Sequence, residues 1–218
     1  MLIQQIQQLH FNLNCQSSIK NLKRTMINKL SAHLARTIVN QNKINPDDLE
    51  LYHYGLFIII SESFLALYCL LIGIALHIII QSIVFYFTFF ILHRFAGGFH
   101  AKTEMHCQII TLSSFLFSMI GIKHSDYFDI NVFIISFSIC CILLLMFAPA
   151  DTPQKKLNVL EKKRFKVLTF LVLVFFLSTL IILIKCHVNK TIISSMIFAI
   201  LLETISVLFG RILNYKLL

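Results

Sequence analysis

The run of apolar residues from Gly55 to Leu92 constrains this chain more than any other feature of its sequence. The run is 38 residues long, and Glu62 is the one formally charged residue within it. A helix needs about 20 apolar residues to cross a bilayer. The run is therefore long enough for two transmembrane helices, and we expect a tight turn between them near residues 73–77.

Four further apolar runs lie at residues 107–122, 131–148, 167–184 and 191–210. The first of these is short and contains three serines, so it is the weakest candidate for a span. Hydrophobic residues make up 57% of the chain and charged residues 13%, whereas soluble domains have about 25% charged residues. The predicted fold is all-α, a polytopic bundle of about six transmembrane helices.

Residues 1–54 are polar enough to stay outside the bilayer. From Ile19 to Ile38, apolar residues recur at helical spacing with lysine and arginine between them, which predicts a basic amphipathic helix. Such a helix lies on a membrane surface or packs on the cytoplasmic face of its own protein. Both positions stay open here. The chain divides into an N-terminal cytoplasmic segment, 1–54, and a transmembrane domain, 55–218.

The basic residues predict how the spans are oriented. With six spans and a cytoplasmic N-terminus, 16 of the 19 Lys and Arg residues lie on the cytoplasmic side, and Lys123, Lys185 and Lys190 lie outside. Cytoplasmic loops are enriched in basic residues, so both termini of this multi-pass plasma-membrane protein are expected in the cytoplasm. The formal net charge of +9 then reports topology and contact with anionic lipid rather than nucleic-acid binding.

The stretch "HRFAGGFHAKTEMHC", from His93 to Cys107, is an unusually polar segment between two apolar runs. A cysteine acts as a nucleophile through its thiolate, which a nearby histidine, cationic groups or a helix N-terminus favours. Cys107 is expected at the start of a helix, and His100 lies seven residues before it. On one straight helix they would be about 10.5 Å apart along the axis. A Cys/His pair therefore needs a bend, which Gly97 and Gly98 permit.

Residue types alone leave three interpretations of this stretch open. The first is a catalytic pair of Cys107 with His100 as base, or with His106 as a rival base. The second is a metal site made from these three residues and His93, although their spacing is not typical of structural zinc. The third is a wet loop at the membrane interface whose histidines and cysteine are incidental.

The stretch as a whole resembles the signature of the accessory gene regulator B (AgrB) family, which has an arginine, small residues, His-Ala and then a cysteine seven positions after the histidine. Two other segments are similar to those of the family. They are "FAPADTPQKK" at residues 147–156 and "LLETISVL" at residues 201–208. The similarity in order and spacing begins near Met26, so residues 1–25 are expected to be a dispensable extension.

The resemblance implies a membrane cysteine endopeptidase of Gram-positive quorum sensing that needs no cofactor and no metal. Such enzymes remove the C-terminal tail of a small AgrD-type precursor peptide and help to close its thiolactone or lactone ring. Cys107 would be the nucleophile and His100 the general base, at the cytoplasmic interface. Arg94, Gly97 and Gly98 would shape the site, and the protein would be a homodimer.

Two carboxylates and a basic cluster complete the set of candidate residues. Glu62 and Glu203 lie within predicted spans, where acids are costly and usually face the bundle interior or water. Each is a candidate for orienting His100 or for a structural role. The basic cluster is expected to contact anionic lipid, an acidic tail on the precursor, or both. Its members are Lys155, Lys156, Lys162, Lys163, Arg164 and Lys166.

Two hypotheses of other classes compete with the peptidase. A small-solute or peptide transporter would place Glu62, His77 and Glu203 along a pathway and make Cys107 incidental. A non-catalytic scaffold would only bind a membrane-bound peptide. Transport should survive Cys107→Ser, whereas proteolysis should not.

Overall fold

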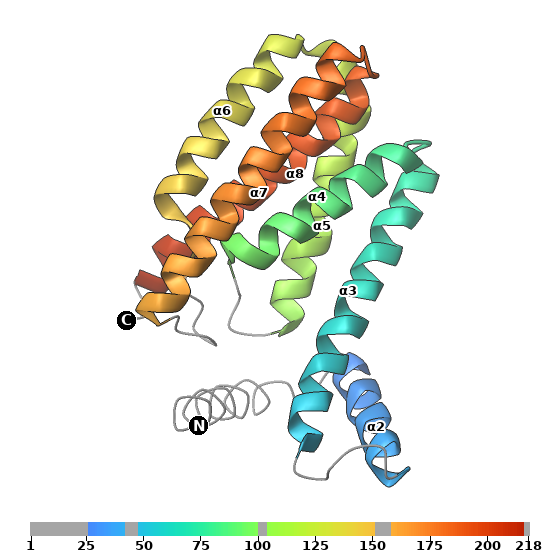
Figure 1. Cartoon of the computed structure of the whole chain (residues 1–218). Helices are drawn as coiled ribbons and strands as arrows, with labels where there is room; N and C mark the ends of the chain where they lie inside the picture. Colours follow the sequence, from blue (N-terminus) through green and yellow to red (C-terminus); the bar gives the residue numbers. More distant parts are fainter. Residues whose placement is uncertain (1–25, 42–47, 100–103, 151–157, 216–218) are drawn as a thin grey trace. The chain divides into compact units, whose positions relative to one another are not determined.

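The computed structural model describes residues 26–41, 48–99, 104–150 and 158–215 (Figure 1). Within these ranges the chain forms helices joined by short connections, and none of the described residues is in a strand. The predicted all-α fold is confirmed. The elements are α2 (Met26–Asn40), α3 (Leu49–Ala75), α4 (Ile79–Ala96), α5 (Glu104–Lys123), η2 (Ser125–Tyr127), α6 (Ile130–Phe147), α7 (Val159–Lys185) and α8 (Lys190–Tyr215).

Five of the described helices, α3, α4, α6, α7 and α8, are long and apolar enough to cross a membrane. They confirm a polytopic helical bundle, and the turn between the first two lies at residues 76–78. The third predicted span corresponds to α5, which is 20 residues long but is not among the five. Its polar residues, among them Ser113, Ser114 and Ser118, lower its hydropathy. The count of six spans and the cytoplasmic position of both termini stay predictions.

Contacts between residues divide the chain into two units. The first unit holds α2, α3 up to Leu67 and the first residues of α5 up to Ile109. The second unit holds α3 from Tyr68, all of α4, α5 from Ile110, and everything that follows. The predicted boundary between residues 54 and 55 stays a prediction.

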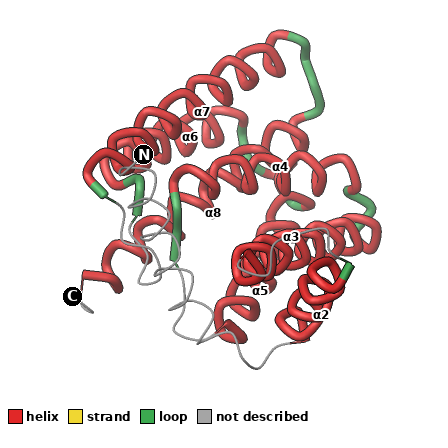
Figure 2. The backbone as a smooth tube through the Cα atoms, turned by 60° about the horizontal axis from the view of Figure 1, so that its bottom comes forward, coloured by secondary structure: helices red, strands yellow, loops and turns green. Residues whose placement is uncertain are grey.

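Helix α8 is the central helix of the second unit. It packs against α4 and α6, and α7 contacts α4, α6 and α8 (Figure 2). Leu92, Leu144 and Ile200 are wholly buried in the shared core, whereas Phe117, Ile142 and Phe175 are more than half exposed. Large apolar side chains on the outer faces of long apolar helices suit contact with lipid. The second unit therefore has an apolar core and an apolar outer surface.

In the first unit, α2 buries a face of small residues. Asn28, Ser31 and Ala35 are buried, whereas Leu30 and Leu34 are exposed. Nε2 of His53 on α3 lies 2.8 Å from Oδ1 of Asn28, and this hydrogen bond ties the two helices together. The exposed leucines favour the predicted position of an amphipathic helix on a membrane surface. The part of that predicted helix before Met26 lies outside the described residues.

Helix α7 begins eight residues before the predicted span that starts at Val167. Residues 159–166, which precede that apolar run, form the first turns of the helix. The cause is a capping box in which the backbone N–H of Asn158 donates to Oε2 of Glu161 at 2.9 Å. The side chain of Asn158 accepts from the N–H of Val159 at 2.7 Å. Capping satisfies backbone donors at the helix start, so a helix can extend into charged sequence.

Candidate functional site

The polar stretch predicted as functional begins in the last turn of α4 and leaves the helix through a glycine turn. Helix α4 ends at Ala96, and the N–H of Gly97 donates to the carbonyl of His93 at 3.1 Å. Gly97 has φ 68° and ψ −169°, a backbone region that is essentially restricted to glycine. Residues 97–99, called the 97–99 turn below, therefore depart from the helix in a direction that only this glycine allows.

The segment at residues 148–150 lies against one side of the 97–99 turn. The N–H of Ala150 donates to the carbonyl of Ala96 at 3.0 Å. A Cβ atom at Gly97 would lie 2.8 Å from the carbonyl oxygen of Ala150. Just before this segment, Nη1 of Arg211 on α8 donates to the carbonyl of Phe147 at 2.9 Å. The end of α6 is thus fixed both to the end of α4 and to α8.

Helix α8 lies against the other side of the turn. The N–H of Phe99 donates to Oγ of Ser206 at 3.0 Å. A Cβ atom at Gly98 would lie 2.5 Å from Oγ of Ser206 and 2.6 Å from Cε1 of His93. A Cβ atom at Gly210 would lie 2.9 Å from the carbonyl oxygen of Gly98. Two glycines therefore let the backbone of the turn approach α8 closely, and a serine hydroxyl fixes it there.

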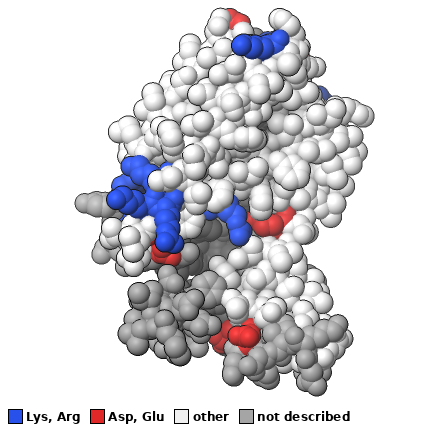
Figure 3. Space-filling view, viewed as in Figure 1, with Lys and Arg blue, Asp and Glu red and all other residues white. Residues whose placement is uncertain are grey.

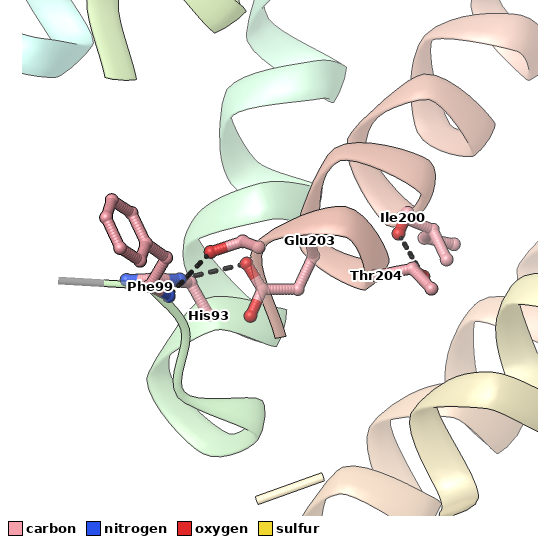
Figure 4. A network of polar contacts seen from close by, with 6 residues as sticks. His93, Phe99, Ile200, Glu203 and Thr204 are labelled. Atoms are coloured by element: carbon pink, nitrogen blue, oxygen red, sulfur yellow. Dashed lines mark hydrogen bonds and ion pairs between the residues drawn. The ribbon is translucent and has the colours of Figure 1, made fainter. Parts of the chain in front are cut away.

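A histidine and a buried glutamate meet beside the turn (Figure 4). Nδ1 of His93 lies 2.9 Å from Oε2 of Glu203, and the two side chains share a hydrogen bond. The side chain of Glu203 is wholly buried, and that of His93 is 28% exposed. The His93 ring stacks on Phe89 with 5.1 Å between ring centroids. Figure 4 shows His93 and Glu203 close to Phe99, the last residue of the 97–99 turn.

The other carboxylate oxygen of Glu203 has no hydrogen-bond partner within the described part of the chain. Oε1 is buried and makes no hydrogen bond to any described residue. Buried polar atoms are normally satisfied, and an acid inside a membrane bundle is costly. His93 is therefore the one side chain that the described structure shows anchoring this carboxylate.

Of the predicted catalytic pair, the structure describes Cys107 and not His100. Cys107 lies in the first turn of α5, half-buried, at the helix start where the sequence placed it. It belongs to the first unit, whereas the 97–99 turn belongs to the second. His100 lies outside the described residues, so its pairing with Cys107 stays a prediction. His106, the rival base, is exposed.

The other predicted site residues lie at several places. Arg94 is exposed in the last turn of α4, next to His93. Glu62 is half-buried on α3 in the first unit. Glu203 lies in the second unit and shares a hydrogen bond with His93. Its predicted role in orienting His100, which lies outside the described residues, stays a prediction. His77, which the transporter hypothesis invokes, is exposed in the turn between α3 and α4 with φ 59°.

Part of the predicted basic cluster lies on the first turns of α7. Lys162, Lys163, Arg164 and Lys166 are all exposed, and Figure 3 shows basic side chains gathered over this end of the helix. Lys155 and Lys156 lie outside the described residues. Four cations on two helical turns give this end of the second unit a strong positive potential.

The described residues include no group of three or more His, Cys, Asp or Glu side chains that could hold a metal ion. No disulfide joins the described cysteines, which are Cys69, Cys107, Cys140, Cys141 and Cys186. Cys69 and Cys140 are buried among apolar residues, where cysteine packs as a small hydrophobic side chain.

The fold and these contacts define a polytopic helical membrane protein with a glycine turn held against its central helix. The model of the family Accessory gene regulator B matches residues 27–207. The chain belongs to this family. The three segments that resemble it, at residues 93–99, 147–150 and 201–208 within the described ranges, meet around the 97–99 turn.

Several curated proteins are similar to most of the chain. An AgrB-like protein of Clostridium perfringens (strain SM101 / Type A) is 25% identical over 186 residues, covering 81% of this chain and 87% of that protein. The accessory gene regulator protein B of Staphylococcus lugdunensis is 28% identical over 163 residues, covering 70% and 84%. That of Staphylococcus intermedius is 23% identical over 154 residues, covering 71% and 79%. No solved structure matches the chain.

The sequence did not predict the pairing of His93 with Glu203. His93 was a candidate only as a metal ligand, and the structure pairs it with Glu203, 110 positions away. The sequence offers nine histidines and no rule for pairing any of them with a distant acid. The one available signal was that an acid within a span needs a partner.

Proposed function

We propose that this chain is a membrane cysteine endopeptidase that removes the C-terminal tail of an AgrD-type precursor peptide in quorum sensing. The observation that supports the proposal most is Cys107, half-buried in the first turn of α5, in a member of this family. Backbone N–H groups at a helix start stabilise a thiolate. The proposed base is His100, and Arg94, Gly97 and Gly98 shape the site.

The proposed chemistry has two acyl transfers. The thiolate of Cys107 attacks the carbonyl carbon of the scissile peptide bond, the C–N bond breaks, and protonated His100 gives its proton to the leaving amine. The product is a thioester between Cys107 and the new C-terminus of the peptide. A thiol or hydroxyl side chain of that same peptide then attacks the thioester. The ring closes, the C–S bond breaks and the Cys107 thiol is restored.

Water competes with this second step. Attack by water on the thioester would release a linear acid instead of a ring. Active sites that exclude water suppress such side reactions. Shielding of the proposed site from bulk water at the membrane edge would therefore favour ring closure over release of the linear acid.

Partners follow from charge and from the family. The exposed basic residues of α7 suit an acidic tail on the precursor, and they also suit anionic lipid, at about 1 kcal/mol for each basic residue near the surface. A homodimer in the plasma membrane is the proposed assembly. Glu62, on the first unit, is proposed as a supporting acid.

The test is a cleavage assay in membranes. The chain is co-expressed with an AgrD-type precursor, and the size of the precursor is followed on a gel. We expect the wild type to shorten the precursor, while Cys107→Ala, Cys107→Ser and His100→Ala leave it whole at equal membrane levels. Cys186→Ala, which removes an exposed thiol, is the matched control and should cut normally. Cleavage by Cys107→Ala would overturn the proposal.

A further inference from the structure

We infer that His93 and Glu203 are a positioning pair that fixes the 97–99 turn, and through it the direction in which the chain enters residue 100. The inference rests on the proposed function of His100, because it assigns a role in placing that residue. From the sequence, Glu203 was a candidate for orienting His100 directly. Here its carboxylate acts on residue 100 through the His93 ring and the 97–99 turn.

The first step is the contact between the His93 ring and the turn. The space that a Cβ atom would occupy at Gly98 is filled by Cε1 of His93 and Oγ of Ser206, at 2.6 Å and 2.5 Å. Gly98 is therefore packed between the His93 ring and the Ser206 hydroxyl. A rotation of the ring would remove one of these two contacts.

The second step is what holds the ring. Oε2 of Glu203 shares a hydrogen bond with Nδ1, and Phe89 stacks on one ring face. Phe89 in turn packs edge-on against Phe115, which is wholly buried. A buried hydrogen bond to a carboxylate is among the stronger protein hydrogen bonds. The ring is thus fixed in orientation by the carboxylate and in position by the aromatic stack.

The third step is the spacing on α8. Glu203 and Ser206 are three residues apart, so they face the same side of the helix. Glu203 fixes the ring of His93, and Ser206 accepts from the N–H of Phe99 at 3.0 Å. Glu203 and Ser206, on one turn of α8, therefore hold the His93 ring and the backbone N–H of Phe99 at the end of the 97–99 turn. Oε1 of Glu203 is buried and unpaired among the described residues. Burying this oxygen without a hydrogen bond is unfavourable in free energy.

The test compares four variants, all checked for membrane level. Glu203→Ala removes the acceptor, whereas Glu203→Gln keeps an oxygen for Nδ1 and should restore function. Thr204→Val is the matched control, because the Thr204 hydroxyl is also buried on α8 but donates to Ile200 of its own helix at 2.7 Å (Figure 4). The double variant His93→Phe with Glu203→Leu removes both polar groups and leaves no buried charge, so it guards against misfolding.

Two readouts are measured. The first is hydrogen exchange at the Phe99 amide, which does not depend on peptidase activity. The second is cleavage of an AgrD-type precursor in proteoliposomes, with kcat and KM determined separately. We expect Glu203→Ala and the double variant to exchange faster at Phe99 and to lose about tenfold or more in kcat. KM should change little, and Glu203→Gln and Thr204→Val should stay near the wild type.

The inference is overturned if Phe99 exchanges equally in all variants, or if Glu203→Ala and the double variant keep the kcat of Thr204→Val. It is also overturned if Glu203→Gln is as impaired as Glu203→Ala. A wild type that cuts no precursor, or a Cys107→Ala variant that does, would refute the proposed function instead. The exchange measurement would still decide the positioning role.

Discussion

Substituting Gly97 by alanine tests whether the geometry of the 97–99 turn matters for cleavage. With φ 68° and ψ −169°, the backbone lies in a region that costs a residue with a side chain about 1–3 kcal/mol. The new Cβ would lie 2.8 Å from the carbonyl oxygen of Ala150, which is a backbone atom and cannot rotate away. In Gly97→Ala the backbone of the 97–99 turn is expected to adopt a different, unstrained conformation. To place residue 100 for reaction, the variant must return to the native conformation, and this return costs free energy.

The strain translates into a rate. A cost of about 1–3 kcal/mol in reaching the productive conformation slows the reaction roughly 5- to 150-fold, and the contact with Ala150 adds to that loss. The assay is precursor cleavage in membranes, with rates normalised to the amount of protein. Gly55→Ala is the control, because it lies in α3 with nothing within 4 Å of the added Cβ. Equal rates for Gly97→Ala and Gly55→Ala would refute the reasoning.

Three further predictions concern other parts of the chain. Lys163→Glu combined with Arg164→Glu on α7 should raise KM for the precursor with little change in kcat, and the effect should shrink in high salt; an equal effect of Lys185→Glu on KM would contradict a docking role for the cluster. Asn158→Ala should cost about 1 kcal/mol by breaking the capping box, lowering the thermal midpoint by roughly 2–4 °C, whereas Ser178→Ala, whose exposed hydroxyl bonds within its own helix, should leave it unchanged. A fluorophore at Leu34→Cys should be quenched by spin-labelled lipid more than one at Arg36→Cys, and equal quenching would argue against α2 lying on a membrane surface.

Much of the fold was predictable because membrane helices leave a strong signal. The turn between α3 and α4 and the bounds of α6 followed from apolar runs alone. The apolar run did not predict where α7 begins. The capping box of Asn158 and Glu161 extends the helix into the charged sequence that precedes the run. Helix α5 was placed correctly as a helix, and its crossing of the membrane stays a prediction.

The site was less predictable, because it is made of contacts between distant segments. The sequence indicated a bend at Gly97 and Gly98, because glycine tolerates positive φ. The φ of 68° at Gly97 confirms that the backbone adopts such an angle there. The approach of Gly210 to Gly98 and the bond between His93 and Glu203 follow from how α4 packs on α8. No local pattern encodes that packing.

The central claim is that Cys107 forms a thioester with the precursor peptide. The most direct test is mass spectrometry of the protein after brief exposure to a precursor whose ring-forming side chain has been replaced by alanine. We predict an added mass on the peptide that contains Cys107, equal to the N-terminal fragment of the precursor less one water and released by hydroxylamine. It should be absent from Cys107→Ala and present in Cys186→Ala. Cleavage of the precursor without any adduct at Cys107, or with an adduct at another residue, would contradict the claim.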